Sequence, residues 1–125
     1  MKYFGTDGIR GVFGEDLTLE LASKTARAMV TYAPKKIVIG RDTRESGLAI
    51  VNAMIAEFGG IDVVNVGVSP TMAISFLTKK LACDYGIMIT ASHNPPKYNG
   101  IKIYAKGGVI LNGKALEDLD GLVGK

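Results

Sequence analysis

The chain has 125 residues, 47% of them hydrophobic, so it can form one domain with a buried core and is not a disordered segment. Its net charge is only +3, with scattered cations, which disfavours a nucleic-acid surface but suits small anions such as phosphates. A single cysteine, Cys83, excludes an intrachain disulfide and a multi-cysteine metal site. No apolar run is long enough to span a membrane and no signal segment opens the chain, so we expect a soluble cytoplasmic protein that binds neither membranes nor nucleic acid.

Helix-like and strand-like segments alternate along the chain. Helical apolar spacing and start signals predict helices over residues 18–32, 46–58 and 70–81, and a short one over 116–122. Apolar runs bounded by turn residues predict strands over residues 36–39, 62–68, 85–89, 101–105 and 109–111. This alternation indicates a three-layer α/β/α sandwich around a mixed, mostly parallel sheet, in which the turn at residues 106–108 makes an antiparallel hairpin.

The most informative run covers residues 90–96, Thr-Ala-Ser-His-Asn-Pro-Pro, which follow the predicted strand over 85–89. A hydroxyl at the carboxyl end of a strand, on a loop stiffened by two prolines, stands where α/β proteins commonly place chemistry, and this makes Ser92 a candidate catalytic residue. His93 is the only histidine, and neighbours on an extended chain point to opposite sides, so we expect it to donate to an anion on Ser92 and not to deprotonate the serine. An ordinary proline-rich turn with an incidental serine is the competing interpretation.

Two more cations could converge on Ser92. Arg10 lies in residues 4–11, where three glycines in eight residues permit positive φ, so that its guanidinium could project from a tight turn and hold a phosphate. Lys102 stands ten positions after Ser92, on the following predicted strand, and could return beside the loop. Together these cations predict a cradle for a phosphate on the serine. The competing interpretations are a flexible leader with a surface arginine and a solvated strand lysine.

Two other runs have ligand-like patterns. In residues 40–44, Gly-Arg-Asp-Thr-Arg, Asp42 offers a local partner to both arginines, which favours a structural role for the run over anion binding. Residues 108–115 approach the phosphate-binding P-loop pattern, but Ala115 replaces the Ser or Thr that would bind magnesium, and the Val-Ile-Leu stretch looks like a strand. The P-loop interpretation is therefore rejected.

The runs over residues 4–11, 40–44 and 90–95 occur in the order and spacing of the α-D-phosphohexomutases. Over essentially its whole length the chain resembles the first of that family's four domains, and three motifs in register make the resemblance specific. Within the family, residues 4–11 resemble the phosphoglucosamine mutases. Thr90 and the stretch over 96–98 look more like the phosphomannomutase/phosphoglucomutase branch.

The resemblance implies a catalytic role for four residues. Ser92 would carry a phosphoryl group, give it to a hexose phosphate to form a bisphosphate intermediate, and take one back after that intermediate reorients. Arg10, His93 and Lys102 match positions around the family's phosphoserine. Mg²⁺ would be held by the phosphate on Ser92 and by three aspartates of an Asp-Gly-Asp-Gly-Asp segment in the second domain, and that segment is absent here.

Residues 1–125 are thus expected to be a single domain, equivalent to the first of four, with hexose phosphates and the remaining domains of a parent enzyme as partners. Alone it should lack the metal and sugar sites and turn over no substrate. A face meant for another domain would be exposed, and we expect self-association through it. Two alternatives stay open: a stand-alone module that binds phosphosugars or a protein partner, and an assembly domain. The serine together with three cations favours an enzyme, because a binding module needs no hydroxyl.

Overall fold

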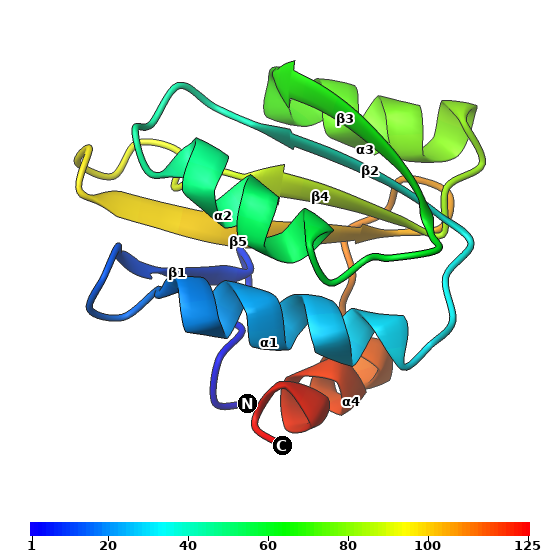
Figure 1. Ribbon diagram of the computed structural model, residues 1–125, viewed down its shortest axis with the longest axis horizontal. Coiled ribbons are helices and arrows are strands. Elements are labelled where there is room, and N and C mark those ends of the chain that lie inside the picture. The colour runs from blue at the N-terminus through cyan, green and yellow to red at the C-terminus, as the bar shows by residue number, and fades with distance from the viewer.

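The computed structural model describes residues 1–125, which form a five-stranded sheet flanked by helices (Figure 1). The strands are β1 (Ile9–Val12), β2 (Lys36–Arg41), β3 (Asp62–Val68), β4 (Tyr85–Ile89) and β5 (Tyr98–Ala105). The helices are α1 (Leu19–Val30), α2 (Gly47–Ile55), α3 (Thr71–Lys80) and α4 (Gly113–Val123). No helix is long and apolar enough to cross a membrane.

The sheet has the strand order β1-β5-β4-β2-β3. β2 is parallel to both of its neighbours, β3 and β4, whereas β5 is antiparallel to β4 and to β1. All strands except β5 therefore point the same way. The prediction of a mixed, mostly parallel sheet is confirmed.

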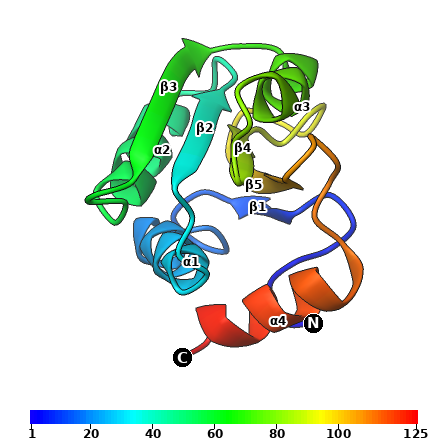
Figure 2. The same ribbon diagram turned by 90° about the vertical axis from the view of Figure 1, so that its right-hand side faces the viewer.

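Helices cover both faces of the sheet, with α1 and α2 on one face and α3 on the other (Figure 2). The larger hydrophobic core lies under α1 and α2 and continues to α4, which adds Leu116, Leu119 and Val123. The smaller core lies under α3. Strand β2, which lies inside the sheet between β4 and β3, contributes to both cores, since Ile37 and Ile39 face the larger core and Val38 faces the smaller one. Burial on both faces explains why this strand is a continuous apolar run and not an alternating one.

Several element boundaries have local causes that the sequence contains. Thr18 precedes α1, and its Oγ1 accepts a hydrogen bond of 3.0 Å from the Leu21 N–H, a cap that contributes about 1 kcal/mol. Pro70 stands directly before α3, where its missing N–H costs no hydrogen bond. These two starts, and the strands over 62–68 and 85–89, agree with the sequence predictions.

Two predictions about the ends of the chain are wrong. Residues 109–111 form no regular strand, although the predicted hairpin is present: the Ala105 N–H donates to the Val109 carbonyl, the Leu111 N–H donates to the Ile103 carbonyl, and Ile110 makes a single bridge with Tyr104. Arg10 lies on strand β1, not on a tight turn. The turn comes earlier, where the backbones of Gly5 and Gly8 exchange hydrogen bonds.

Candidate active site

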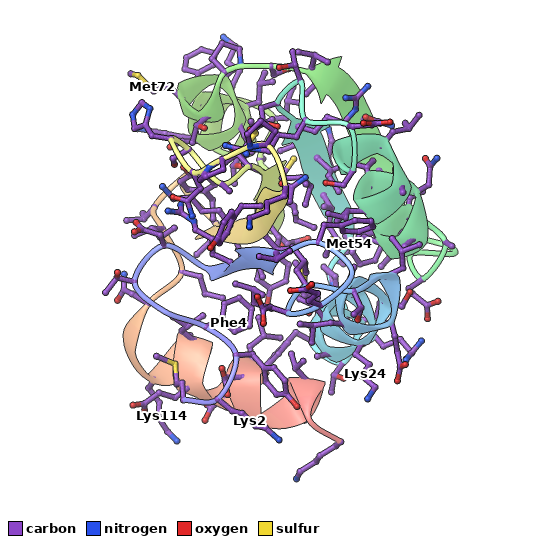
Figure 3. The ribbon with its side chains drawn as sticks, turned by 90° about the vertical axis from the view of Figure 1, so that its left-hand side faces the viewer. Lys2, Phe4, Lys24, Met54, Met72 and Lys114 are labelled. Carbon is purple, nitrogen blue, oxygen red and sulfur yellow. The ribbon has the colours of Figure 1, made fainter.

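Two loops at one edge of the sheet carry the predicted site. Because β2 and β4 are parallel neighbours, residues 42–46 after β2 and residues 90–97 after β4 leave the sheet at the same edge. Phe13, just after β1, joins this edge through a hydrogen bond of 2.9 Å from its N–H to the Lys97 carbonyl. Figure 3 faces this edge, with the yellow loop of residues 90–97 between the blue strand β1 and the green helix α3.

Ser92 is exposed at the turn of this loop and has an unusual backbone conformation. Its φ is +53°, in the left-handed region that residues other than glycine rarely adopt. The Ser92 N–H donates to Thr90 Oγ1 at 3.0 Å, and the Asn94 N–H donates to the Ala91 carbonyl at 3.0 Å. The serine hydroxyl therefore projects from a turn that the loop's own hydrogen bonds close.

The loop of residues 42–46 supports the serine loop through Asp42. Thr90 Oγ1 donates to Asp42 Oδ2 at 2.6 Å, and the Arg44 N–H and Nε donate to the same carboxylate at 3.0 and 3.1 Å. Arg41 Nη1 donates to the Asp42 carbonyl oxygen at 3.2 Å. Both arginines are thus bound within the protein, as the structural interpretation of residues 40–44 requires.

Arg44 also reaches across to the serine loop. Its Nη1 and Nη2 donate hydrogen bonds of 2.7 to 3.2 Å to four backbone carbonyls, those of Ser92, Asn94, Pro95 and Tyr98. The sequence signals a bond between Arg44 and Asp42, because they are two residues apart. It contains no comparable signal for these four contacts, whose partners lie about fifty residues further along the chain.

Arg10 is the one predicted cation that contacts the serine. It pairs with Gly100 across β1 and β5, and its Nη2 lies 3.3 Å from Ser92 Oγ. A Cβ at Gly100 would approach the Thr90 carbonyl oxygen to 2.5 Å, so only glycine lets the strands and the loop come this close. Arg10 Nε is buried without a hydrogen-bond partner. An unpaired buried donor beside a hydroxyl is suited to an anion that has yet to bind.

The other two predicted cations are near but do not contact Ser92. Lys102 is half-buried on β5, paired with Met88, and its Nζ lies 5.7 Å from the centre of the Tyr104 ring. It shares the α3 face of the sheet with Arg10, because Gly100, the partner of Arg10, is two residues away on the same strand. His93 is exposed and makes no hydrogen bond. The structure thus joins Arg10 to the serine and leaves both other side chains free.

Beside the serine lies an open hollow of about 530 Å³ without a single hydrophobic lining residue, formed by Asp42, Thr43, Arg44, Glu45, Ser92, Asn94 and Pro96. A second hollow of about 400 Å³ adjoins it at Glu45 and Pro96. The chain has no cluster of three or more His, Cys, Asp or Glu that could hold a metal ion. Asp42, the carboxylate bound to the serine loop, already accepts from Thr90 and Arg44. The hollow is therefore polar, and the unpaired donor beside the serine belongs to Arg10 and not to the lining of the hollow.

Comparisons with known proteins agree with this geometry. Residues 1–123 match the family described as phosphoglucomutase/phosphomannomutase, alpha/beta/alpha domain I. Phosphoglucosamine mutase of Finegoldia magna is 48% identical over 128 aligned positions, which cover 98% of this chain and 28% of that protein. Phosphoglucosamine mutase of Dictyoglomus turgidum is 50% identical, over 89% of this chain and 26% of that protein. The chain thus spans about a quarter of the length of these relatives.

A solved structure gives the same result for the fold. The phosphoglucomutase/phosphomannomutase family protein of Burkholderia thailandensis superposes with a TM-score of 0.81 at 33% identity, over 96% of this chain and 29% of that one. The superposition covers nearly the whole chain, so the two folds agree over almost all of its length. On the strength of the sequence match and the shared fold, the chain belongs to the phosphoglucomutase/phosphomannomutase family, and it corresponds to domain I.

Proposed function

We propose that this chain is the phosphoserine-bearing domain of a mutase that interconverts a hexose 6-phosphate and the 1-phosphate through a bisphosphate intermediate. The observation that carries the proposal is the exposed Ser92 hydroxyl at the carboxyl edge of the sheet, which Arg10 Nη2 contacts while the buried Nε of the same guanidinium has no hydrogen-bond partner. Glucosamine phosphate is the favoured hexose phosphate, because the two relatives described above are named phosphoglucosamine mutases. Residues 1–125 would be the first of four domains.

The chemistry requires Ser92 to exchange a phosphoryl group with the sugar. In the first half, the bond between phosphorus and Ser92 Oγ breaks while a bond to a sugar hydroxyl oxygen forms, and in the second half the phosphoryl group at the other position of the sugar returns to Oγ. Such transfer depends mainly on a positioned donor and on cations around the moving oxygens. A phosphoserine carries close to two negative charges, which suits the guanidinium of Arg10.

His93 and Lys102 belong to the same proposal. His93 is on the serine loop and Lys102 is on strand β5, which follows that loop, and no ion pair or hydrogen bond holds either side chain, so both would be free to turn toward a phosphate on Ser92. With Arg10 they would place three donors around the transferred group. The proposal therefore assigns catalytic roles to Ser92, Arg10, His93 and Lys102.

The proposal includes Mg²⁺, which would neutralise charge on the transferred phosphoryl group. The carboxylates of this chain do not form its site, since none clusters in threes and Asp42 is committed to Thr90 and Arg44. Apart from the phosphate on Ser92, the metal ligands would have to come from other domains. Those other domains would also take part in substrate recognition. The proposal places the protein in the cytoplasm. We therefore expect the 125-residue chain alone to show no mutase turnover.

The first test is to read the native coding sequence past Lys125. An Asp-Gly-Asp-Gly-Asp segment there supports the mutase, whereas an immediate stop codon refutes it and makes a phosphate- or partner-binding module the leading function.

The second test uses the complete protein with Ser92→Ala, which should reduce mutase activity by at least about 10³-fold, because no other group can carry the phosphate. Ser23→Ala on α1 is the matched control. Mass spectrometry should place phosphate on Ser92 in the unmodified protein, and full activity of Ser92→Ala would sink the proposal.

A further inference from the structure

Arg44 has no donor left for a ligand. A guanidinium carries five N–H groups, and Arg44 makes five hydrogen bonds, one from Nε and two each from Nη1 and Nη2. Every acceptor belongs to the protein: one is a carboxylate and four are backbone carbonyls of the serine loop. Arg10 is the opposite case, because its buried Nε has no partner. The two arginines near Ser92 therefore differ in kind, and Arg44 acts on the loop and not on the phosphate.

The contacts of Arg44 determine the backbone on one side of Ser92. Arg44 Nη2 donates to the Ser92 carbonyl at 2.9 Å, and the Ser92 N–H donates to Thr90 Oγ1 at 3.0 Å. Both backbone polar groups of the serine are thus held, and φ stays at +53°. This is the conformation from which Ser92 Oγ lies 3.3 Å from Arg10 Nη2.

Asn94 and Pro95 extend this restraint along the loop. Their carbonyls accept from the same guanidinium at 2.9 and 2.7 Å, and the Tyr98 carbonyl at the start of β5 accepts at 3.2 Å. Carbonyl oxygens repel one another unless a cation lies between them, so this arrangement of the loop depends on the charge of Arg44. Asp42 in turn fixes the guanidinium through Nε at 3.1 Å.

We propose that Arg44 is a positioning residue that holds Ser92 in its left-handed conformation and so aims the hydroxyl, and the phosphate it carries, at Arg10 and the substrate. The inference rests on the proposed mutase function for its kinetic consequence. Its structural part, that Arg44 orders the serine loop, stands independently of that function.

The kinetic test uses the complete protein with Arg44→Ala and Arg44→Lys. Misplacing a reacting group by about 1 Å costs about 10²-fold, so Arg44→Ala should lower kcat by about that factor with KM changed less than about threefold. Lysine keeps the charge but has three donors and no planar fork, so the kcat of Arg44→Lys should lie between that of Arg44→Ala and that of the unmodified protein. Millimolar guanidinium should restore part of the kcat of Arg44→Ala, which loss of stability alone would not allow. The control is Arg27→Ala, which removes the exposed ion pair with Glu57 far from this edge and should leave kcat unchanged.

The structural test uses the amide NMR spectrum and hydrogen exchange of the 125-residue chain. Arg44→Lys and Arg44→Ala should shift and deprotect amides within residues 91–98, while core amides such as that of Ile87 stay protected. Unchanged amides in the loop, or a kcat within about threefold of the unmodified protein in both variants, overturn the inference. If Ser92→Ala proves fully active, the mutase proposal fails, and the loop amides alone decide whether Arg44 positions Ser92. If Ser92→Ala is inactive and both Arg44 variants are fully active, only the inference fails.

Discussion

The conformation of Ser92 is maintained by a short chain of hydrogen bonds that starts at Asp42. A left-handed serine costs about 1–3 kcal/mol and persists only when its surroundings impose it. Here Thr90 connects the two residues, since its Oγ1 donates to the Asp42 carboxylate at 2.6 Å and accepts the Ser92 N–H at 3.0 Å. The sequence identifies Ser92 as a candidate because it follows an apolar strand. It does not predict the role of Thr90, because the Thr90 hydroxyl can bond to Asp42 and to the Ser92 N–H only when the fold brings the two loops together.

We predict that Thr90→Val lowers the free energy of unfolding by about 2 kcal/mol. Valine has the shape of threonine without the hydroxyl, so the substitution leaves the Ser92 N–H without an acceptor and removes one donor from a carboxylate, at about 1–3 kcal/mol for such losses. Urea unfolding of the 125-residue chain measures the effect. Thr43→Val is the control, because Thr43 is exposed and makes no side-chain hydrogen bond. Equal stability of the two variants would show that the hydroxyl of Thr90 is not part of the support.

Helix α4 anchors the segment that leads to Arg10. Asp120 is buried on this helix, and its carboxylate accepts hydrogen bonds of 2.8 to 2.9 Å from the N–H groups of Lys2, Tyr3 and Phe4. Phe4 in turn is buried in the larger core (Figure 3). The turn between Gly5 and Gly8 follows directly, and then β1 begins. The anchoring therefore fixes where β1 starts, and with it the position of Arg10.

Elements were predictable where the cause is local. The Thr18 cap and the proline before α3 are local signals, and so are the valine-rich stretch over 62–68 and the apolar run over 85–89, which predict strands. The sequence does not predict strand β1, because its pairing is not local: the strand is only four residues long and bonds to a strand about ninety residues later. The same nonlocal pairing explains why Arg10 was expected on a turn.

The anchoring by Asp120 should make stability depend on pH. Burial acts to raise the pKa of Asp120, but the N–H groups of Phe4, Lys2 and Tyr3 outweigh it and hold that pKa below its usual range. A carboxyl whose pKa is lower in the folded state stabilises the fold above its unfolded pKa of about 3.9, and this contribution is lost as the pH falls through the folded value. Asp120→Asn should therefore lower stability by about 2 kcal/mol at pH ~7, since bonds to a charged acceptor are worth about 1.5–3 kcal/mol. The deficit should shrink as the pH falls below about 4.

Thermal unfolding of both proteins between neutral and acidic pH measures this difference. Asp118→Asn on the same helix is the matched control, because Asp118 is exposed and bonds only to the Lys114 side chain, so it should change stability little at any pH. A deficit of Asp120→Asn that stays constant down to the most acidic pH would contradict the charge-dependent part of the argument.

At the scale of the whole molecule, the topology brings the site together and leaves it open. Because β1, β2, β3 and β4 all point the same way, their carboxyl ends and the start of β5 share one edge, where Arg10, the loop of residues 42–46 and the serine loop meet. The motifs in the sequence identify these pieces, but only the fold shows that Arg10 touches the serine while Lys102 does not. The hollow beside Ser92 is open to solvent, and all of its lining residues come from the two loops. In relatives about four times longer, further parts of the chain are available to face it.

Exposed apolar side chains on α3 give the last prediction, that the 125-residue chain self-associates. Met72 is 83% exposed on α3 (Figure 3). Phe76 is 63% exposed and stands four residues later, so the two side chains share one side of the helix, and Val68 before the helix is 55% exposed. Large apolar side chains grouped in this way gain free energy when another surface covers them. Light scattering coupled to size exclusion should show a mass that rises with concentration.

Phe76→Glu should return the chain to a monomer at the same concentrations, because a charge on this surface opposes its burial. The control is Leu48→Glu on α2, a side chain of similar exposure on the other face of the sheet, which should leave the association unchanged. A constant monomer mass over a wide concentration range would contradict the prediction. Association that Leu48→Glu abolishes and Phe76→Glu does not would instead place the contact on the α1 and α2 face.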